Sequence, residues 1–177
     1  SFFLINEKPS SSKDPFALRR SAIGLLRIII QNKLNLKIRD LINYNIALLE
    51  EHNCIDNDCL VEIGGRNNRF ITGHGFKKYL NLDIIEPRDK HDIKGDITVV
   101  NPEIANDSVS CCYSHDVFEH ISNPFDAAKE IYRFVKPGGV VFVDTLFAWR
   151  EHGCPNDYFR YTINGLKSIF NNAGFKF

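Results

Sequence analysis

The sequence predicts an α/β protein with a doubly wound, mostly parallel sheet and helices on both faces, preceded by an N-terminal helical segment. Two observations support this fold class. From residue 59 onward, short β-branched or alternating segments are separated by amphipathic ones, as right-handed β-α-β crossovers require. The first 50 residues instead carry two apolar stripes at helical spacing. We therefore expect a helical extension over residues 1–55 and an α/β core over residues 56–177.

The composition limits the classes of function. The chain has 177 residues, 44% of them hydrophobic, which suits one folded domain and excludes a disordered chain. The 22 basic and 22 acidic residues balance to a net charge of zero, which argues against a nucleic-acid partner. No apolar stretch approaches the ~20 residues of a membrane span, and no signal peptide is present, so we expect a cytoplasmic protein.

Methionine and cysteine usage adds two expectations. The chain contains no Met, which indicates that Ser1 is not a native start and that the protein is longer. The five cysteines are odd in number and form no C-x-x-C pair, which predicts reduced thiols. Their spacing predicts no zinc site, and no metal ligand is assigned from the sequence.

The predicted strands and helices follow in order along the core. Strands are expected at residues 59–63, 79–83, within 91–98, at 110–114 and at 140–145. Asn123 and Pro124 begin a helix that ends at Lys136-Pro137-Gly138-Gly139. A last helix is expected near 164–173, ended by Gly174. Only fifteen residues, 66–80, separate Gly65 from Asn81, so the crossover there is expected to be short or irregular.

Polar and glycine residues gather at the carboxyl ends of these strands, where ligands bind in an open α/β sheet. The first strand ends at Glu62, Gly64 and Gly65, and the second ends at Asp83. Asp96 follows the third strand, and Ser114 and His115 end the fourth. The glycines allow close approach of a ligand to the backbone, and the Asp83 carboxylate can accept both hydroxyl protons of a ribose.

These motifs together resemble the S-adenosylmethionine-dependent methyltransferases of Rossmann-like fold, from about Leu60 to Phe177. Leu-Val-Glu62-Ile-Gly64-Gly65 is similar to their first motif, and Asn81-Leu-Asp83-Ile84 to the second-strand acid that holds the ribose. Gly95-Asp96-Ile97 is similar to the motif that frames the adenine. The segment from Asn106 to Ile121 is similar to the family's fourth-strand segment and the helix after it, and Asn123-Pro124 through Gly139 to the helix and turn before the fifth strand.

The resemblance implies S-adenosyl-L-methionine as the cofactor and an in-line methyl transfer. The residues it assigns to the cofactor are Glu62, Gly64, Gly65, Arg66, Asp83, Ile84, Asp96, Ile97, Ser114 and His115. Family members commonly have glycine two and four places after Gly64, where this chain has Arg66 and Asn68. Arg66 could crowd the methionine moiety, pair with its carboxylate, or be displaced.

The segment from His152 to Thr162 is similar to a bacterial methyltransferase subgroup found with glycan and surface-polysaccharide genes. It implies a small-molecule or glycan-type acceptor, with Asp157, Tyr158 and Arg160 shaping its pocket. His152 or His115 is the expected base for a hydroxyl acceptor. Asp157 and Arg160 could instead form an ion pair that braces a loop, whereas Glu119 and His120 are expected to hold a neighbouring turn and Thr162 to cap the last helix.

Other interpretations stay open. A degenerate domain of the same fold could act as a partner module without catalysis, and a nicotinamide-dependent oxidoreductase would lack its glycine fingerprint here. The family normally continues into a sixth and a seventh strand, so we expect the core to be cut after Phe177 and to have an open sheet edge. The extension over residues 1–55 is expected to act as a lid or an interface, and a homodimer could form through it or through the open edge.

Overall fold

The computed structural model describes residues 2–5, 59–65, 76–153 and 155–177, the first of these ranges as backbone only. The described elements in chain order are β1 (Phe2–Ile5), β2 (Cys59–Ile63), β3 (Lys78–Asp83), β4 (Asp92–Lys94), β5 (Val109–His115), the 3-10 helix η1 (Phe118–His120), α3 (Pro124–Phe134), β6 (Val135–Asp144) and α4 (Ile163–Ala173).

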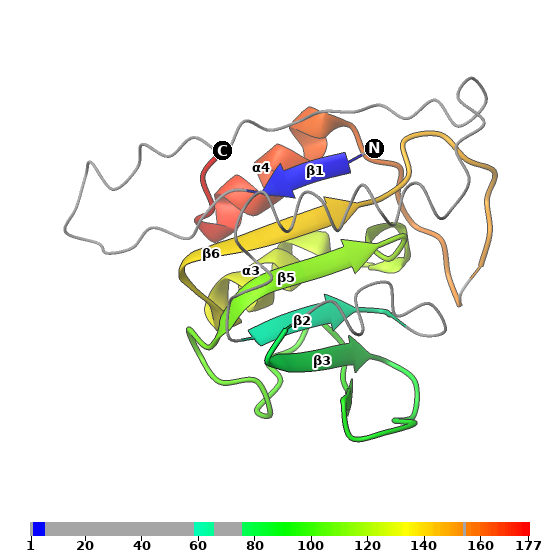
Figure 1. Ribbon diagram of the computed structural model, residues 1–177. Helices are drawn as coiled ribbons and strands as arrows, with labels where there is room; N and C mark the ends of the chain where they lie inside the picture. Colours follow the sequence, from blue (N-terminus) through cyan, green and yellow to red (C-terminus); the bar gives the residue numbers. More distant parts are fainter. Residues whose placement is uncertain (1, 6–58, 66–75, 154) are drawn as a thin grey trace.

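The strands form one six-stranded sheet in the order β1-β6-β5-β2-β3-β4. The five strands from β2 to β6 run parallel to one another, and the arrowheads of β2, β3, β5 and β6 point to the same end of the molecule in Figure 1. Strand order reverses between β2 and β5, so the switch point lies beside the end of β2. The predicted α/β fold with a mostly parallel, Rossmann-like sheet is confirmed.

The edge of the sheet differs from the prediction. We expected the last strand of the core to have an open edge, but β1 pairs antiparallel with β6, from Phe2 opposite Asp144 to Ile5 opposite Val141. The physical reason is that an unpaired strand leaves backbone donors and acceptors unsatisfied, and a segment distant in sequence can supply the missing partners. Within the described part of the chain, the outer strands of the sheet are therefore β1 and β4.

Both predicted core helices are present and begin and end as their sequences indicate. The Asn123 side chain accepts a hydrogen bond from the backbone N–H of Asp126, with Pro124 at the first helical position of α3. Thr162 caps α4 by accepting from the backbone N–H of Gly165, as expected. Gly174 ends α4 with φ of 112°, a left-handed conformation that favours glycine.

The core lies between the sheet and the pair α3 and α4, which pack against each other (Figure 1). Phe134, Phe170 and Phe175 are among its largest fully buried side chains. Phe170 contacts the rings of both Phe118 and Phe175, at centroid distances of 5.4 and 5.6 Å. This packing fixes η1, which follows β5, relative to the last helix.

Several strand boundaries differ from the prediction by a few residues, and one turn is placed differently. Lys136-Pro137-Gly138-Gly139 lies inside β6 rather than ending the preceding helix, because α3 already ends at Phe134. The predicted helical extension over residues 1–55, apart from β1, and the crossover over residues 66–75 lie outside the described residues. Among the residues that the structure describes, none of the helices is long and apolar enough to cross a membrane.

Candidate functional site

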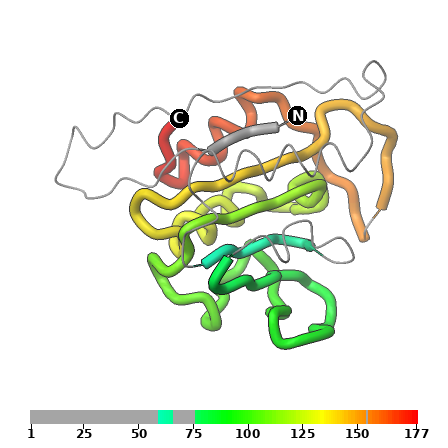
Figure 2. Tube along the Cα trace, viewed as in Figure 1, coloured from blue at the N-terminus to red at the C-terminus, as the bar shows by residue number. Residues whose placement is uncertain are grey.

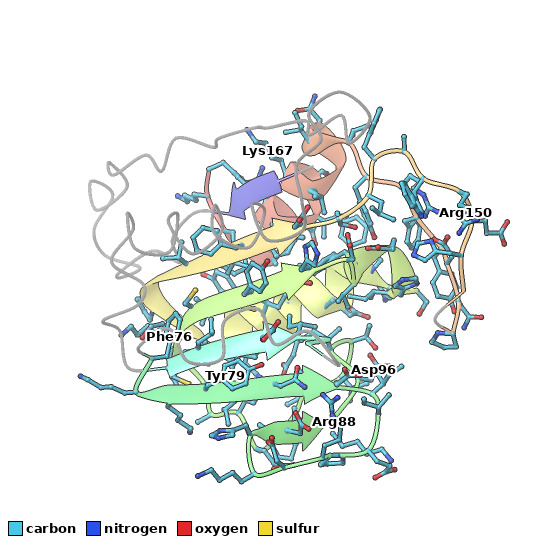
Figure 3. The ribbon with its side chains drawn as sticks, turned by 45° about the vertical axis from the view of Figure 1, so that its right-hand side comes forward. Phe76, Tyr79, Arg88, Asp96, Arg150 and Lys167 are labelled. Atoms are coloured by element: carbon cyan, nitrogen blue, oxygen red, sulfur yellow. The ribbon has the colours of Figure 1, made fainter. Side chains whose placement is uncertain are left out.

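A cavity of about 680 Å³ opens at the carboxyl ends of the parallel strands, beside the switch point. Asp96 lies at this end of the sheet in Figure 3, and the loop from β6 to α4 runs along the same end in Figure 2. The cavity is lined by residues from four strand ends and from this loop: Ile63, Gly64, Leu82, Asp83, Ile84, Ile85, Gly95, Asp96, Ile97, Thr98, Asp116, Val117, His120, Ile121, Ser122, Pro155 and Tyr158.

The turn after β2 brings backbone close to the cavity. Gly64 has φ of 70°, and a Cβ atom at this position would lie 2.5 Å from Cγ2 of Val117. Its backbone N–H donates to the carbonyl of Leu82 at 2.9 Å, which ties the turn to β3. Glycine is required here both for its left-handed backbone and for the close approach of the segment after β5.

Two predicted cofactor residues present carboxylates in the cavity wall. Asp83 ends β3, and its Oδ1 accepts a hydrogen bond from the backbone N–H of Ile85 at 3.2 Å. Asp96 accepts at Oδ1 from both the backbone N–H and the hydroxyl of Thr98, each at 2.8 Å. These bonds hold each carboxylate at the carboxyl end of its strand. The apolar neighbours Ile84 and Ile97 line the same cavity, as predicted.

Glu62 and Ser114, which were also assigned to the cofactor, do not line the cavity. Glu62 is buried beneath the glycine turn and accepts a hydrogen bond from the Tyr79 hydroxyl at 2.5 Å. A Cβ atom on Gly65 would lie 2.6 Å from the carboxyl carbon of Glu62. Ser114 is fully buried, and its hydroxyl has no hydrogen-bond partner among the described residues. Gly65 is likewise outside the cavity lining, with its backbone N–H donating to Asn81 at 2.9 Å, and Arg66 lies outside the described residues.

His115 lies behind the cavity rather than in its wall. Its Nδ1 donates to Oδ2 of Asp144 at 2.7 Å, and its Nε2 lies 3.4 Å from Oδ2 of Asp116, which lines the cavity. Burial would lower the pKa of His115, but the hydrogen bond and charge of Asp144 outweigh it, and the pKa is raised. Burial also raises the pKa of the Asp116 carboxyl, and the nearby imidazole opposes this.

The loop between β6 and α4 is braced by an ion pair. Arg160 binds Asp157 through two N–H groups, at 2.5 Å and 2.7 Å, and also donates to the carbonyls of Trp149, Arg150 and Phe159. The guanidinium holds the pKa of the Asp157 carboxyl well below its usual range. Asp157 and Arg160 therefore brace the loop, whereas Tyr158, between them, lines the cavity.

Two further residues that the sequence analysis assigned to a turn lie at the site. His120 lines the cavity, and the Glu119 side chain is fully buried beside it. The backbone carbonyl of Glu119 accepts from the N–H groups of Tyr158 and Phe159, at 2.8 and 3.2 Å, and so anchors the loop as expected. Burial raises the pKa of the Glu119 carboxyl, and the hydrogen bond from Thr145 opposes this.

Sequence reasoning missed Asp116, Val117, Ile121 and Ser122 as cavity residues. A signal for Asp116 and Val117 was available, since they follow the fourth predicted strand at the end of the sheet where ligands bind, whereas Ile121 and Ser122 come after η1. His152, the other expected base, does not line the cavity, but its ring contacts that of His120 edge-on at a centroid distance of 4.9 Å.

Comparison with known proteins gives two family matches that overlap over residues 64–81. Residues 64–143 match the family described as methyltransferase domain, and residues 1–81 match the family described as glycyl-tRNA synthetase beta subunit. The beta subunit of glycine–tRNA ligase from Rickettsia canadensis is 45% identical over 82 residues, which are 46% of this chain and 12% of that protein. The chain spans 10% to 19% of the length of the curated relatives it matches.

Solved structures resemble the α/β core. A SAM dependent methyltransferase from Archaeoglobus fulgidus aligns with a TM-score of 0.58 at 15% identity, covering 78% of this chain and 71% of that one. A SAM dependent methyltransferase from Aquifex aeolicus aligns with a TM-score of 0.56 at 18% identity, covering 72% and 77%. The parallel sheet described here therefore has the Rossmann-like fold of SAM-dependent methyltransferases.

Proposed function

We propose that the chain is a methyltransferase that binds S-adenosyl-L-methionine in the cavity and methylates a small-molecule or glycan-type acceptor. The observation that carries the proposal is the arrangement of Gly64, Asp83 and Asp96 in one cavity wall at the ends of three neighbouring strands. The match of residues 64–143 to the methyltransferase domain family supports it.

The cavity residues fit the chemistry of this cofactor. The Asp83 carboxylate can accept hydrogen bonds from both ribose hydroxyls, and its fixed Oδ1 limits the orientation it can take. Asp96 can accept from the exocyclic amine of adenine, with Ile97 offering an apolar contact to the ring. The left-handed turn at Gly64 leaves no side chain between the end of β2 and the ligand.

When bound, the cofactor supplies an activated sulfonium methyl group, so the protein mainly has to align an acceptor and exclude water. Asp116, His120, Ser122 and Tyr158 lie in the same cavity wall and form its acceptor-facing part in this proposal. Hydroxyl and imidazole groups of this kind can orient a polar acceptor. The net charge of zero gives no electrostatic preference for nucleic acid.

A base is useful if the acceptor is a hydroxyl. We assign this role to His115, whose Nδ1 is held by Asp144 and whose Nε2 faces Asp116. An acceptor proton would pass first to the Asp116 carboxylate, which lines the cavity, and from it to Nε2 of His115, where Asp144 would stabilise the imidazolium that forms. His152, the other candidate base, does not line the cavity, but its ring contacts that of the cavity residue His120.

Isothermal titration of the full chain with S-adenosylmethionine and with S-adenosylhomocysteine tests the proposal. We expect binding of both at one site per chain, and affinity at least tenfold lower in Asp83→Asn, because hydrogen bonds to a charged acceptor are worth about 1.5–3 kcal/mol. Glu103→Gln, an exposed acid outside the cavity, is the matched control and should bind as wild type.

Binding that is absent from folded wild-type protein would overturn the proposal. Binding with no methylated product, after incubation with candidate glycans and small hydroxyl compounds, would favour the degenerate partner module instead. Mass spectrometry of the acceptors distinguishes these outcomes.

A further inference from the structure

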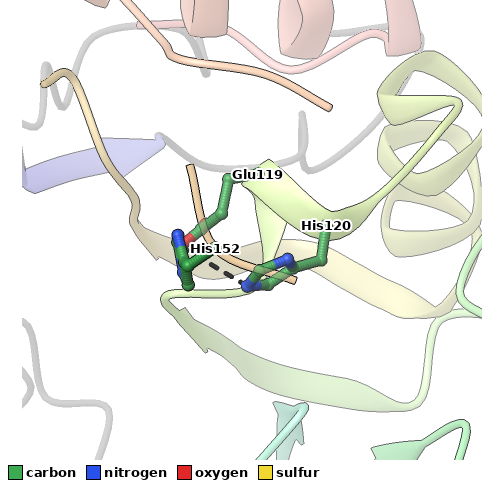
Figure 4. A group of neighbouring side chains, drawn as sticks. All are labelled: Glu119, His120 and His152. Carbon is green, nitrogen blue, oxygen red and sulfur yellow. Dashed lines mark ion pairs between the residues drawn. The ribbon is translucent and has the colours of Figure 1, made fainter. Parts of the chain in front are cut away.

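We propose that Glu119, His120 and His152 form a binding site for one divalent metal ion at the edge of the cavity. A carboxylate oxygen of Glu119 and one ring nitrogen from each histidine lie within 4.8 Å of one another (Figure 4). The three residues come from two segments far apart in the sequence, η1 and the loop after β6, which the fold brings together. The cysteine spacing predicts no metal site, and these three residues come together only in the folded chain.

The first argument is that one oxygen of the buried Glu119 carboxylate makes no hydrogen bond with the described residues. The Glu119 side chain has no exposed surface, and its Oε2 accepts from the Thr145 hydroxyl at 2.7 Å. Its Oε1 is one of three buried side-chain atoms in the described residues that make no hydrogen bond. Most buried polar atoms are hydrogen-bonded, so a buried carboxylate oxygen that makes no hydrogen bond and faces two imidazoles points to a cation.

The second argument is that His120 is already oriented as a ligand. Its Nδ1 donates to the backbone carbonyl of Asn156 at 2.6 Å. This bond selects the tautomer whose lone pair is on Nε2, and Nε2 lies 4.0 Å from Oε1 of Glu119. Metal-binding histidines usually donate their second ring N–H to a carbonyl or carboxylate in this way.

His152 has a similar supporting contact. Its Nδ1 lies 3.2 Å from Oδ2 of Asp157, and its backbone N–H donates to the same oxygen at 2.8 Å. Asp157 is itself held by Arg160, so the loop-bracing ion pair also fixes the histidine. The carboxylate leaves Nε2 as the nitrogen with a free lone pair.

The separations are close to those of a small transition-metal site. Ligands bonded at about 2.1 Å in tetrahedral geometry lie about 3.4 Å apart. On binding, the 4.0 Å between His120 and Glu119 would shorten by about 0.6 Å, and the 4.8 Å limit of the cluster by about 1.4 Å, through rotation of the imidazole side chains. Two imidazoles and one carboxylate are a donor set typical of Zn²⁺ and related divalent ions, and three protein ligands leave a coordination position open.

The open coordination position of the ion faces a functional space, because its ligand His120 also lines the cavity. An ion beside it could bind an acceptor hydroxyl oxygen and lower the pKa of that hydroxyl. This part of the inference rests on the proposed function and narrows its acceptor to an oxygen nucleophile. The site itself does not depend on methyl transfer.

Metal binding is tested on the full chain, stripped with a chelator and titrated with ZnCl₂ in a calorimeter. Co²⁺ serves as a second probe, since its visible absorption reports nitrogen and oxygen ligands directly. We expect one Zn²⁺ per wild-type chain in the absence of S-adenosylmethionine. His152→Asn and Glu119→Gln should each weaken binding at least tenfold, because even residues that only support ligands contribute 10–100-fold. His91→Asn, a histidine outside the cluster, is the matched control and should bind as wild type.

Zn²⁺ affinity that is the same in His152→Asn as in wild type would overturn the site, as would wild-type protein that binds no ion. His152 lies on a partly exposed loop, so this variant remains informative if Glu119→Gln fails to fold. Titrating S-adenosylmethionine into the metal-free protein keeps the two proposals separate. Cofactor binding without Zn²⁺ binding overturns only the metal site, whereas Zn²⁺ binding without cofactor binding supports the site and overturns the proposed function.

Discussion

His115 and Asp144 join the ends of two neighbouring parallel strands through a hydrogen bond of 2.7 Å between Nδ1 and Oδ2. The His115 side chain is 20% exposed, and its other ring nitrogen, Nε2, points toward the cavity residue Asp116. The same contact thus contributes both to the pairing of β5 with β6 at their carboxyl ends and to the protonation of a group beside the site.

Replacing Asp144 should lower the pKa of His115. In the folded protein burial lowers this pKa, and the hydrogen bond and charge of Asp144 more than offset the effect. In Asp144→Asn the charge is lost and burial remains, so the pKa should fall; NMR titration of the imidazole protons measures it. The surface variant Asp126→Asn is the control and should leave the titration unchanged. A pKa unaffected by Asp144→Asn would contradict the assignment.

The pair should also make stability depend on pH. Because the folded-state pKa of His115 is raised above its ordinary value of about 6.5, the extra stability is fully present below that pH. It is lost as the pH rises through the folded-state pKa. Urea unfolding of wild type and Asp144→Asn at several pH values should therefore show a difference that is largest in mild acid. A difference that grows toward alkaline pH would contradict this sign.

Gly64→Ala should destabilise the protein more than Gly138→Ala. Both glycines have positive φ, 70° and 79°, which costs an alanine about 1–2 kcal/mol. A Cβ on Gly64 would also meet Val117 at 2.5 Å, whereas one on Gly138 meets nothing within 4 Å. Overpacking adds about 1–3 kcal/mol at Gly64 only. Urea unfolding gives both values, and a double-mutant cycle with Val117→Ala should recover part of the clash. Equal costs at the two glycines would show that Val117 is not in the way.

Asp157→Asn should loosen the loop between β6 and α4. The carboxylate accepts hydrogen bonds from the Arg160 guanidinium and from the backbone N–H of His152. The uncharged amide of Asn cannot form the two charge-assisted hydrogen bonds with the guanidinium. Hydrogen exchange at the His152 amide should become faster, while exchange in α3 stays as in wild type. Asp126→Asn, which removes a surface pair with Lys129, is the matched control. Unchanged exchange at His152 would show that the ion pair does not brace the loop.

Phe170→Ala should cost about 3–5 kcal/mol of unfolding free energy, the usual range for a buried phenylalanine. Phe170 is fully buried between the rings of Phe118 and Phe175. Phe147→Ala, at a side chain that is 53% exposed, should change stability by less than about 0.5 kcal/mol. Comparable losses in the two variants would place Phe170 outside the core.

The elements of the core could be predicted because their signals are local. The buried strand at residues 59–63, the Asn123-Pro124 helix start and the glycine that ends α4 each follow from neighbouring residues alone. Asp83 and Asp96 could be placed at the site because the ends of parallel strands meet at one edge of a sheet.

The sequence by itself determined the α/β fold and the strand ends that line the cavity, since periodicity, caps and glycine turns act over a few residues. Only the tertiary structure decided that β1 pairs with β6, that Asp157 binds Arg160 rather than facing the cavity, and that Glu119 and His120 meet His152. These contacts join residues up to 142 positions apart, as between Phe2 and Asp144, or depend on where a side chain turns within a loop. Neither kind of contact can be predicted from the local sequence pattern. Both depend on how the whole chain packs, because folding favours the partners that leave few buried polar groups without hydrogen bonds.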